Sequence, residues 1–314
     1  MPDRVLLPKD HNGRRLDHAI RSIWPNVPIS AVMRSLRKGG VRIDGVRVRS
    51  GGFRVETGQE IIVPWEAAPP PDRPRTARSV PILWRGENVL VVDKPARLLV
   101  QPDVKDGDSV ITRVWGMVGS TRETTGFAPA AVHRLDRNTT GVLAVALDGE
   151  ALRELLRLFR ERAVSKRYLA VVVGVPVARG VIDAPLLKTD DGVVRVDKNG
   201  RSAETRYERI STARVDGFDL SLVEMELLTG RTHQARVHMA HIGHPVLGDG
   251  KYADMGRSKD GIEANRRLKS ARPLLHALSL GFPEGLTGPL LEVSGRTFRS
   301  PPPEEFSIYM AYIR

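Results

Sequence analysis

The residues best suited to chemistry stand in one short polar stretch, His133-Arg134-Leu135-Asp136, just ahead of an apolar run. That run, residues 142–147, ends at Asp148-Gly149 and is typical of a buried strand. Asp136 is therefore expected on a loop at the end of a strand, where functional carboxylates are often held. Adjacent guanidinium groups favour the ionised form of a carboxylate. Such a carboxylate can attack or stabilise a sugar carbon, although a loop aspartate in an ordinary salt bridge would show the same pattern.

Two further motifs follow along the chain. Residues 166–170 read Lys-Arg-Tyr-Leu-Ala, and residues 230–238 read Gly-Arg-Thr-His-Gln-Ala-Arg-Val-His. With His133-Arg134-Leu135-Asp136 and Thr139-Thr140-Gly141 before them, this order of motifs resembles the RluA/RluC-type pseudouridine synthases. The resemblance extends from about residue 80 to the C-terminus. It departs from the family pattern at Thr140, where Ser is commoner, and at Ala235, where Ile or Leu is usual, and neither change removes a group that the chemistry requires.

The resemblance implies an enzyme that breaks the N-glycosidic bond of a uridine in RNA, turns the uracil and rejoins it through C5. That reaction requires no redox change or activated donor, so no cofactor is expected. Asp136 is the expected nucleophile or transition-state stabiliser, by attack on C1′ or by removal of the 2′ proton to give a glycal. Arg236 is expected to pair with Asp136 and hold it ionised. Tyr168 is expected to stack on the uracil and to help remove the C5 proton, although a core aromatic residue in a strand is the alternative.

Three further residues are expected to serve the substrate. Arg134 can fill the place of a base that is flipped out of its stack, or hold a phosphate. His133 is expected to orient the loop that carries Asp136 more than to transfer a proton. Arg231 is a candidate phosphate contact.

Four histidines in or after the last motif raise the question of a metal site. On a helix, His233, His238, His241 and His244 would be spread around the surface, not stacked at positions i and i+4. No carboxylate stands at ligand spacing among them. We therefore predict no metal site.

The composition is compatible with a nucleic-acid partner. The 314 residues include 49 Lys and Arg against 37 Asp and Glu, a net charge of +12 that suits binding to a polyanion. The arginines are spread along the chain, which a generally Arg-rich proteome would also produce. The absence of cysteine suits a reducing compartment, and no segment resembles a membrane span or a signal peptide. We expect a cytoplasmic protein whose partner is RNA, with no membrane association and no obligate protein partner.

The N-terminal residues form a pattern of their own. Two amphipathic helical segments precede short strands in residues 1–66, a pattern that looks like the α-L RNA-binding fold. A basic cluster is expected where the second helix meets the first strand, either as an RNA contact or as an ordinary solvated face: Arg34, Arg37, Lys38 and Arg42. Residues 67–80 are rich in proline and are predicted to be a semi-rigid linker.

Residues 81–314 are expected to form the catalytic domain. The pattern predicts an α+β fold with a mixed, largely antiparallel sheet and helices on its faces, and the resemblance implies that this central sheet is bent, as in the pseudouridine synthase fold. An amphipathic helix is predicted over residues 149–163, whose arginines are more often a solvated face than an RNA contact. A strand-to-helix turn is predicted over residues 230–242. Residues 249–272 are mixed in charge and poor in apolar residues, which predicts a mobile surface loop.

The function expected from these observations is a cofactor-free RNA pseudouridine synthase with an N-terminal RNA-binding domain. The segment 202–207 and the N-terminal unit look most like the RluC type, which implies 23S rRNA, or a large-subunit assembly intermediate, as substrate. A tRNA-modifying member of the same family is the first alternative. A non-catalytic ribosome-assembly factor is the second, although such a protein would tend to lose Asp136. A metal-dependent hydrolase is the weakest.

Overall fold

The computed structural model describes residues 3–8, 11–24, 27–65, 78–103, 107–118, 127–254 and 260–310. Most of the predicted linker, residues 67–80, lies outside the described residues. Within the described part, no helix is both long enough and apolar enough to cross a membrane.

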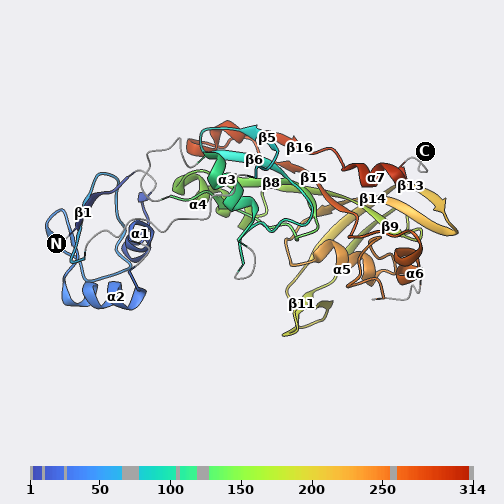
Figure 1. The fold of residues 1–314 in the computed structure, drawn as a ribbon, viewed down its shortest axis with the longest axis horizontal. Helices are drawn as coiled ribbons and strands as arrows, with labels where there is room; N and C mark the ends of the chain where they lie inside the picture. Colours follow the sequence, from blue (N-terminus) through green and yellow to red (C-terminus); the bar gives the residue numbers. More distant parts are fainter. Residues whose placement is uncertain are drawn as a thin grey trace.

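The N-terminal unit has its own sheet and its own apolar core (Figure 1). Its elements are β1 (Asp3–Leu6), α1 (Leu16–Ile23), α2 (Ile29–Lys38), β2 (Arg42–Ile43), β3 (Val46–Arg47) and β4 (Glu60–Val63). The strands form an antiparallel sheet in the order β1-β4-β2-β3. Leu16 and Ile20 of α1 and Leu36 of α2 are fully buried, as expected of amphipathic helices that pack on a sheet.

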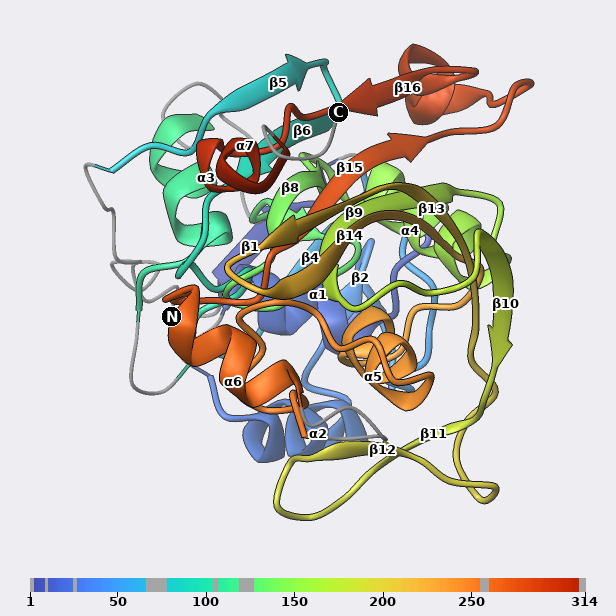
Figure 2. The ribbon, with the colours of Figure 1, turned by 90° about the vertical axis from the view of Figure 1, so that its right-hand side faces the viewer.

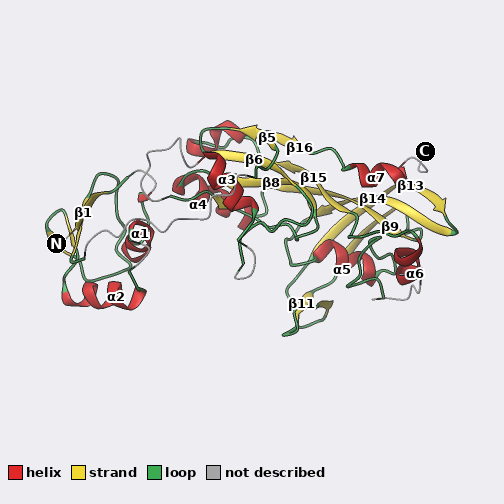
Figure 3. Cartoon of the chain, viewed as in Figure 1, coloured by secondary structure: helices red, strands yellow, loops and turns green. Residues whose placement is uncertain are grey.

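The remaining elements build a much larger sheet. The first half of this part of the chain contains β5 (Ile82–Arg85), β6 (Val89–Lys94), α3 (Val110–Val118), β7 (Ala130–Ala131), β8 (Thr140–Ala146), α4 (Gly149–Arg160), β9 (Ser165–Val173), β10 (Arg179–Asp183), β11 (Leu186–Lys188) and β12 (Val194–Val196). The second half contains β13 (Glu204–Val215), β14 (Phe218–Leu227), α5 (Gln234–His241), α6 (Asp260–Arg267), β15 (Leu275–Gly281), a 3-10 helix (Gly288–Val293), β16 (Thr297–Arg299) and α7 (Glu304–Met310). Figure 3 shows how the strands run through the length of this part with the helices around them.

Ten strands of this part form one sheet. Its main order is β10-β13-β14-β9-β15-β8-β6-β5, with β16 on β15 and β7 on β8. The β15–β8 pair is parallel, and the other pairs described in this sheet are antiparallel. β11 and β12 form a separate hairpin. The predicted α+β fold with a mixed, largely antiparallel sheet is confirmed.

Gly141 allows the parallel pair to form close to the site. It pairs with Ala277 of β15 and has a φ of +109°, a conformation that L side chains rarely adopt. A Cβ at this position would lie 2.1 Å from the carbonyl oxygen of Ala277. The glycine therefore permits this close pairing at the second residue of β8, five residues after Asp136.

Helices cover both faces of the sheet (Figure 2). Alternate residues of β9 belong to different cores: Tyr168 packs in the cluster that includes α3 and α5, whereas Leu169 packs in the one that includes α6 and α7. α4 and the 3-10 helix pack against the other side of β6 and β8. This alternation places Tyr168 on the same face as α5.

The prediction of a mobile surface loop over residues 249–272 is wrong for the described residues of that segment, 249–254 and 260–272. Asp249 and Tyr252 are fully buried, and residues 260–267 form α6. Tyr252 packs in a small core with Val237 of α5, and Ala264 packs under the sheet. The segment is held by the large buried ring of Tyr252 and by the buried ion pair of Asp249 with Arg236, and hydropathy alone shows neither.

Candidate active site

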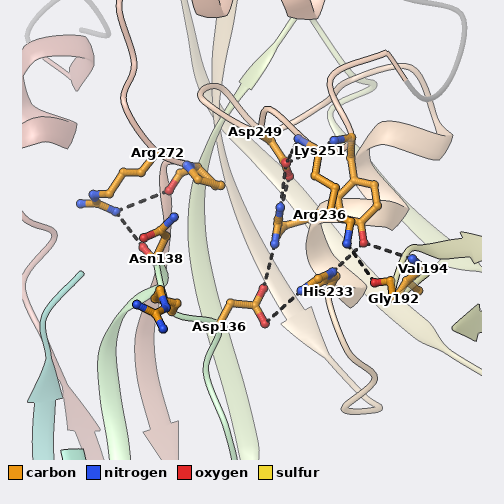
Figure 4. Close-up of polar contacts among 12 residues, drawn as sticks. Asp136, Asn138, Gly192, Val194, His233, Arg236, Asp249, Lys251 and Arg272 are labelled. Atoms are coloured by element: carbon orange, nitrogen blue, oxygen red, sulfur yellow. Dashed lines mark hydrogen bonds and ion pairs between the residues drawn. The ribbon is translucent and has the colours of Figure 1, made fainter. Parts of the chain in front are cut away.

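Segments that are distant in the sequence meet around Asp136, and Figure 4 shows its contact with Arg236 and the contact of Arg236 with Asp249. Asp136 lies on the loop between β7 and β8, and Tyr168 comes from β9. Arg236 lies in the first turn of α5, and Asp249 follows that helix. The side chain of Asp136 is 20% exposed, so it is accessible to a substrate from one side.

The Arg236 guanidinium joins two carboxylates. Its Nη1 donates to Oδ2 of Asp136 at 3.2 Å, while Nε and Nη2 donate to the two oxygens of Asp249 at 2.7 Å each. Burial opposes the charge of Arg236, but the hydrogen bonds and charge of Asp249 outweigh burial and raise the pKa of Arg236. The bidentate contact holds the guanidinium in a fixed plane, so its free edge presents one donor to Asp136.

Tyr252 and His233 support the same cluster. The Tyr252 hydroxyl lies 2.6 Å from Nδ1 of His233 and accepts a hydrogen bond from the Val194 backbone N–H. The Arg236 guanidinium lies 4.9 Å from the centre of the Tyr252 ring. Burial lowers the pKa of His233, so its ring is favoured in the neutral form. If the Tyr252 hydroxyl donates to Nδ1, then Nε2 carries the proton and faces Asp136 Oδ1 at 3.8 Å.

Tyr168 is almost completely buried, and its ring lines a cavity together with Asp136. Burial and the charge of Asp136 both raise the pKa of Tyr168. Its hydroxyl therefore remains protonated at neutral pH, which favours a role for the neutral ring over a phenolate base in the free protein.

A buried lysine holds the loop that carries Asp136. The ammonium of Lys94 donates to the backbone carbonyls of Pro95, Leu98 and Arg137, at 2.8, 2.7 and 3.0 Å. Burial lowers its pKa to about 7, against the opposing effect of the Asp136 carboxylate. Arg137 follows Asp136 directly, so these bonds join β6 and the turn after it to the loop that carries Asp136.

Arg272 holds the same loop from the other side. Its Nη1 donates to the carbonyl of Asn138 at 3.1 Å, and its Nη2 pairs with Glu305 of α7. Arg272 itself is buried. The C-terminal helix thus contributes to the position of the loop.

The same cavity, of about 490 Å³, is lined by the three residues that were predicted to contact the substrate: His133, Arg134 and Arg231. The ring of His133 stacks on Phe159 and its Nε2 accepts from the Ala144 backbone N–H at 3.2 Å, while burial lowers its pKa to about 3. A neutral ring in these contacts fits the predicted role of orienting the loop. Arg134 is exposed at the cavity, and Arg231 donates to the Ser202 carbonyl at 3.0 Å.

The basic cluster of the N-terminal unit is on the surface, away from the residues that line this cavity. Its four predicted members, at the end of α2 and the start of β2, are exposed: Arg34, Arg37, Lys38 and Arg42. Arg47 and Arg49 add to it, because their side chains lie about 3.5 Å from the position of a Cβ on Gly39, at the C-terminus of α2. The sequence pattern did not single out these two arginines.

Two of the histidines after position 233, His238 and His244, have structural partners. His238 is buried between the Thr205 hydroxyl and the Ala184 carbonyl, and His244 Nδ1 lies 3.1 Å from the Val173 carbonyl. Among the residues that the structure describes, no group of three or more His, Cys, Asp or Glu is arranged to hold a metal ion.

Several residues of this site were missed in the sequence. Asp249 and Tyr252 fell within the segment predicted to be a mobile loop, and Arg272 at its end. Lys94 stands before Pro95 in a turn, where it is indistinguishable from a surface lysine. The signal that could have found Asp249 is its position between Gly248 and Gly250, because a carboxylate flanked by glycines is typical of a constrained turn.

The family model described as RNA pseudouridylate synthase matches residues 88–241. Human RNA pseudouridylate synthase domain containing 4 has a similar structure, with a TM-score of 0.59 and 28% identity over 74% of this chain and 94% of that one. Human RNA pseudouridylate synthase domain containing 1 aligns with a TM-score of 0.55 and 25% identity, over 76% of this chain and 97% of that one.

The most specific similarity is in sequence. The chain is 34% identical to ribosomal large subunit pseudouridine synthase C of Salmonella typhi, and equally to that of Escherichia coli strain K12, over 92% of this chain and 91% of each relative. The protein of the same name from Vibrio cholerae is 33% identical over the same shares. The chain belongs to the RNA pseudouridine synthase family, and it is an enzyme that isomerises uridine in RNA.

Proposed function

We propose that this enzyme modifies uridines in the 23S rRNA of the large ribosomal subunit, free or in an assembly intermediate, and that it works in the cytoplasm. The observation that supports this substrate is the 34% identity to large-subunit enzymes over 92% of the chain, because that alignment includes the N-terminal unit as well as the catalytic part. A shared N-terminal unit favours a shared RNA, since contacts outside the target base select where the enzyme binds.

In the mechanism that we propose, Asp136 is the group that reacts at the ribose, and no cofactor takes part. Arg236 holds its carboxylate at 3.2 Å and is itself fixed by Asp249. The hydrogen bond from Arg236 goes to Oδ2, so Oδ1, which has His233 Nε2 at 3.8 Å, remains to act on the sugar. The ring of Tyr168 stacks on the uracil while the base turns. Arg134 holds the place or the phosphate of the flipped nucleotide.

Pseudouridine mapping of total RNA tests the substrate assignment. A strain that lacks the gene should lose one or more pseudouridines in 23S rRNA, and a plasmid copy of the gene should restore them. Loss of pseudouridine from tRNA alone would overturn the rRNA assignment in favour of a tRNA-modifying enzyme. An unchanged map of both RNAs would contradict activity on either.

The basic cluster of the N-terminal unit is proposed to hold RNA outside the target loop. It comprises exposed cations on α2 and the β2–β3 hairpin, and none of them lines the cavity at Asp136. Contacts of this kind act on phosphates, so they strengthen binding in a salt-dependent way and carry little base specificity.

Removal of residues 1–68 should therefore weaken binding to a long rRNA substrate and reduce the slope of log Kd against log salt by several units, about 0.9 for each phosphate that is no longer neutralised. Turnover at saturating RNA should change little, because Asp136, Tyr168 and Arg236 lie outside the removed segment. Affinity at several salt concentrations and single-turnover rates measure the two effects. An unchanged salt slope with abolished turnover would show that the unit supports the catalytic fold instead of holding RNA.

A further inference from the structure

The cavity at Asp136 has a strongly cationic wall. Its lining includes one acidic residue, Asp136, against five cations: Arg134, Arg160, Arg162, Lys166 and Arg231. Asp136 is already paired with Arg236. Within the described part of the chain, none of the five cations forms an ion pair with a carboxylate, so the wall carries positive charge that the protein does not neutralise.

Lys166 is the least expected of these cations, because it is buried. It lies two residues before Tyr168 on β9, so the two side chains emerge on the same face of the sheet. Only 8% of the residue is exposed, and its ammonium makes one long hydrogen bond, 3.4 Å to the Val164 carbonyl. An ammonium with three donors and one weak acceptor is poorly compensated for its loss of water.

Its surroundings increase that penalty. Burial lowers the pKa of Lys166, and the positive charge of Arg162 lowers it further, against the opposing charge of Glu226. Glu226 does not line this cavity. The free protein therefore holds two mutually repelling cations at the cavity, which a bound anion would relieve.

Arg162 is held in an unfavourable backbone conformation. It follows α4 with a φ of +60°, and the amides of Arg162 and Ala163 bond to the carbonyls of Phe159 and Leu158. This is the helix-ending turn in which glycine is strongly preferred, since other L residues are strained there. The arginine is thus placed at the cavity at some expense to the stability of the fold, a pattern that is typical of functional positions.

We propose that Lys166 and Arg162 form a phosphate-binding site that holds the RNA backbone next to the nucleotide bound over Tyr168. This inference rests on the proposed function of this cavity in binding RNA, and it assigns Lys166 and Arg162 to the binding of a phosphate. A phosphate supplies the acceptor oxygens that the Lys166 ammonium lacks and separates the two positive charges. The sequence favoured a solvated face for the arginines of the predicted helix over residues 149–163. The proposal assigns one of them, Arg162, to the substrate.

Lys166→Met and Arg162→Gly test the site, because both should weaken RNA binding without weakening the fold. Each variant should bind a short oligouridylate roughly ten- to hundred-fold more weakly, and the salt slope should fall by about 0.7. Thermal unfolding without RNA should occur at the same or a higher temperature than in the wild type, because an uncompensated charge or a strained residue has been removed. Lower unfolding temperatures with unchanged affinity would overturn the proposal by making the two residues structural.

An oligonucleotide with an uncharged linkage tests whether the group bound by Lys166 is a phosphate. The phosphates of an oligouridylate are replaced one at a time by methylphosphonate. At one position, the replacement should weaken binding to the wild type at least ten-fold, relative to the unmodified oligouridylate. The same replacement should not weaken binding to Lys166→Met. If no position shows this coupling, the ammonium binds something other than a phosphate and the proposal fails. Lys198→Met is the matched control, since Lys198 is an exposed lysine that does not line the cavity.

The binding measurements do not depend on turnover, so they separate the two proposals. If the wild type restores no pseudouridine to 23S rRNA but shows the coupling, the rRNA assignment fails and the phosphate site stands. If the wild type is active on 23S rRNA and Lys166→Met has an unchanged KM and affinity, the phosphate site fails alone.

Discussion

Asp136→Asn should abolish pseudouridine formation while the protein remains folded and binds RNA. Asparagine has nearly the same shape as aspartate and keeps an oxygen that can accept the 3.2 Å hydrogen bond from Arg236. It cannot act as a carboxylate nucleophile or accept a proton as a base. We therefore expect the single-turnover rate to fall by at least about 10³-fold, the scale of losing a residue that acts directly on the reacting atoms.

Release of tritium from RNA labelled at uracil C5 measures this rate, and filter binding of the same RNA measures affinity. Asp219→Asn is the control, because Asp219 is a half-exposed carboxylate in an ion pair with Arg214 on the sheet and should tolerate the same change. A rate for Asp136→Asn within ten-fold of the wild type would remove Asp136 from the chemistry.

Asp249→Ala should have the second largest effect, on both stability and activity. Asp249 is fully buried and accepts two of the hydrogen bonds of Arg236, so its removal leaves a guanidinium charge without its main partner in the core. Breaking one side of a buried ion pair is expected to lower the free energy of unfolding by about 3–5 kcal/mol. The remaining folded enzyme should also be slow, because Arg236 is no longer held in the plane that presents Nη1 to Asp136.

Urea unfolding followed by circular dichroism measures the first effect, and the single-turnover rate under folding conditions measures the second. Glu208→Ala is the matched control, since Glu208 pairs with Arg179 on the surface, where such pairs contribute about 1 kcal/mol or less. If Asp249→Ala destabilises the protein no more than Glu208→Ala, Asp249 does not have the anchoring role assigned to it.

The position of Lys94 links the fold to the loop that carries Asp136 in a comparable way. Its ammonium ties the turn at Pro95 to the carbonyl of Arg137, and Arg272 ties the carbonyl of Asn138 to α7. Two buried cations thus hold successive carbonyl groups directly after Asp136. The loop is positioned by its backbone, so substitutions of its exposed side chains need not move the carboxylate.

The sequence alone indicated the candidate residues of the site. Asp136, Tyr168 and Arg236 each stand in a short contiguous motif, and such a motif can be recognised in the sequence without knowledge of the fold. The type of sheet was also predictable, because alternation and turns are local properties of the chain. The predicted pairing of Arg236 with Asp136, 100 residues apart, agrees with the structure, although the resemblance and not the spacing suggested it.

The tertiary structure decided which partners hold those residues and which charges remain unpaired. Asp249 lies 13 residues from Arg236 in a segment of low hydropathy, and only its complete burial distinguishes it from a surface carboxylate. The sequence does not show the environment of Lys94 or of Lys166, although Lys166 begins a motif: the ammonium of Lys94 donates to three carbonyls, whereas that of Lys166 has a single long hydrogen bond. The physical reason is that the state of a charge depends on its distance from other groups and from water, and both are set by the packing of segments that are far apart in the chain.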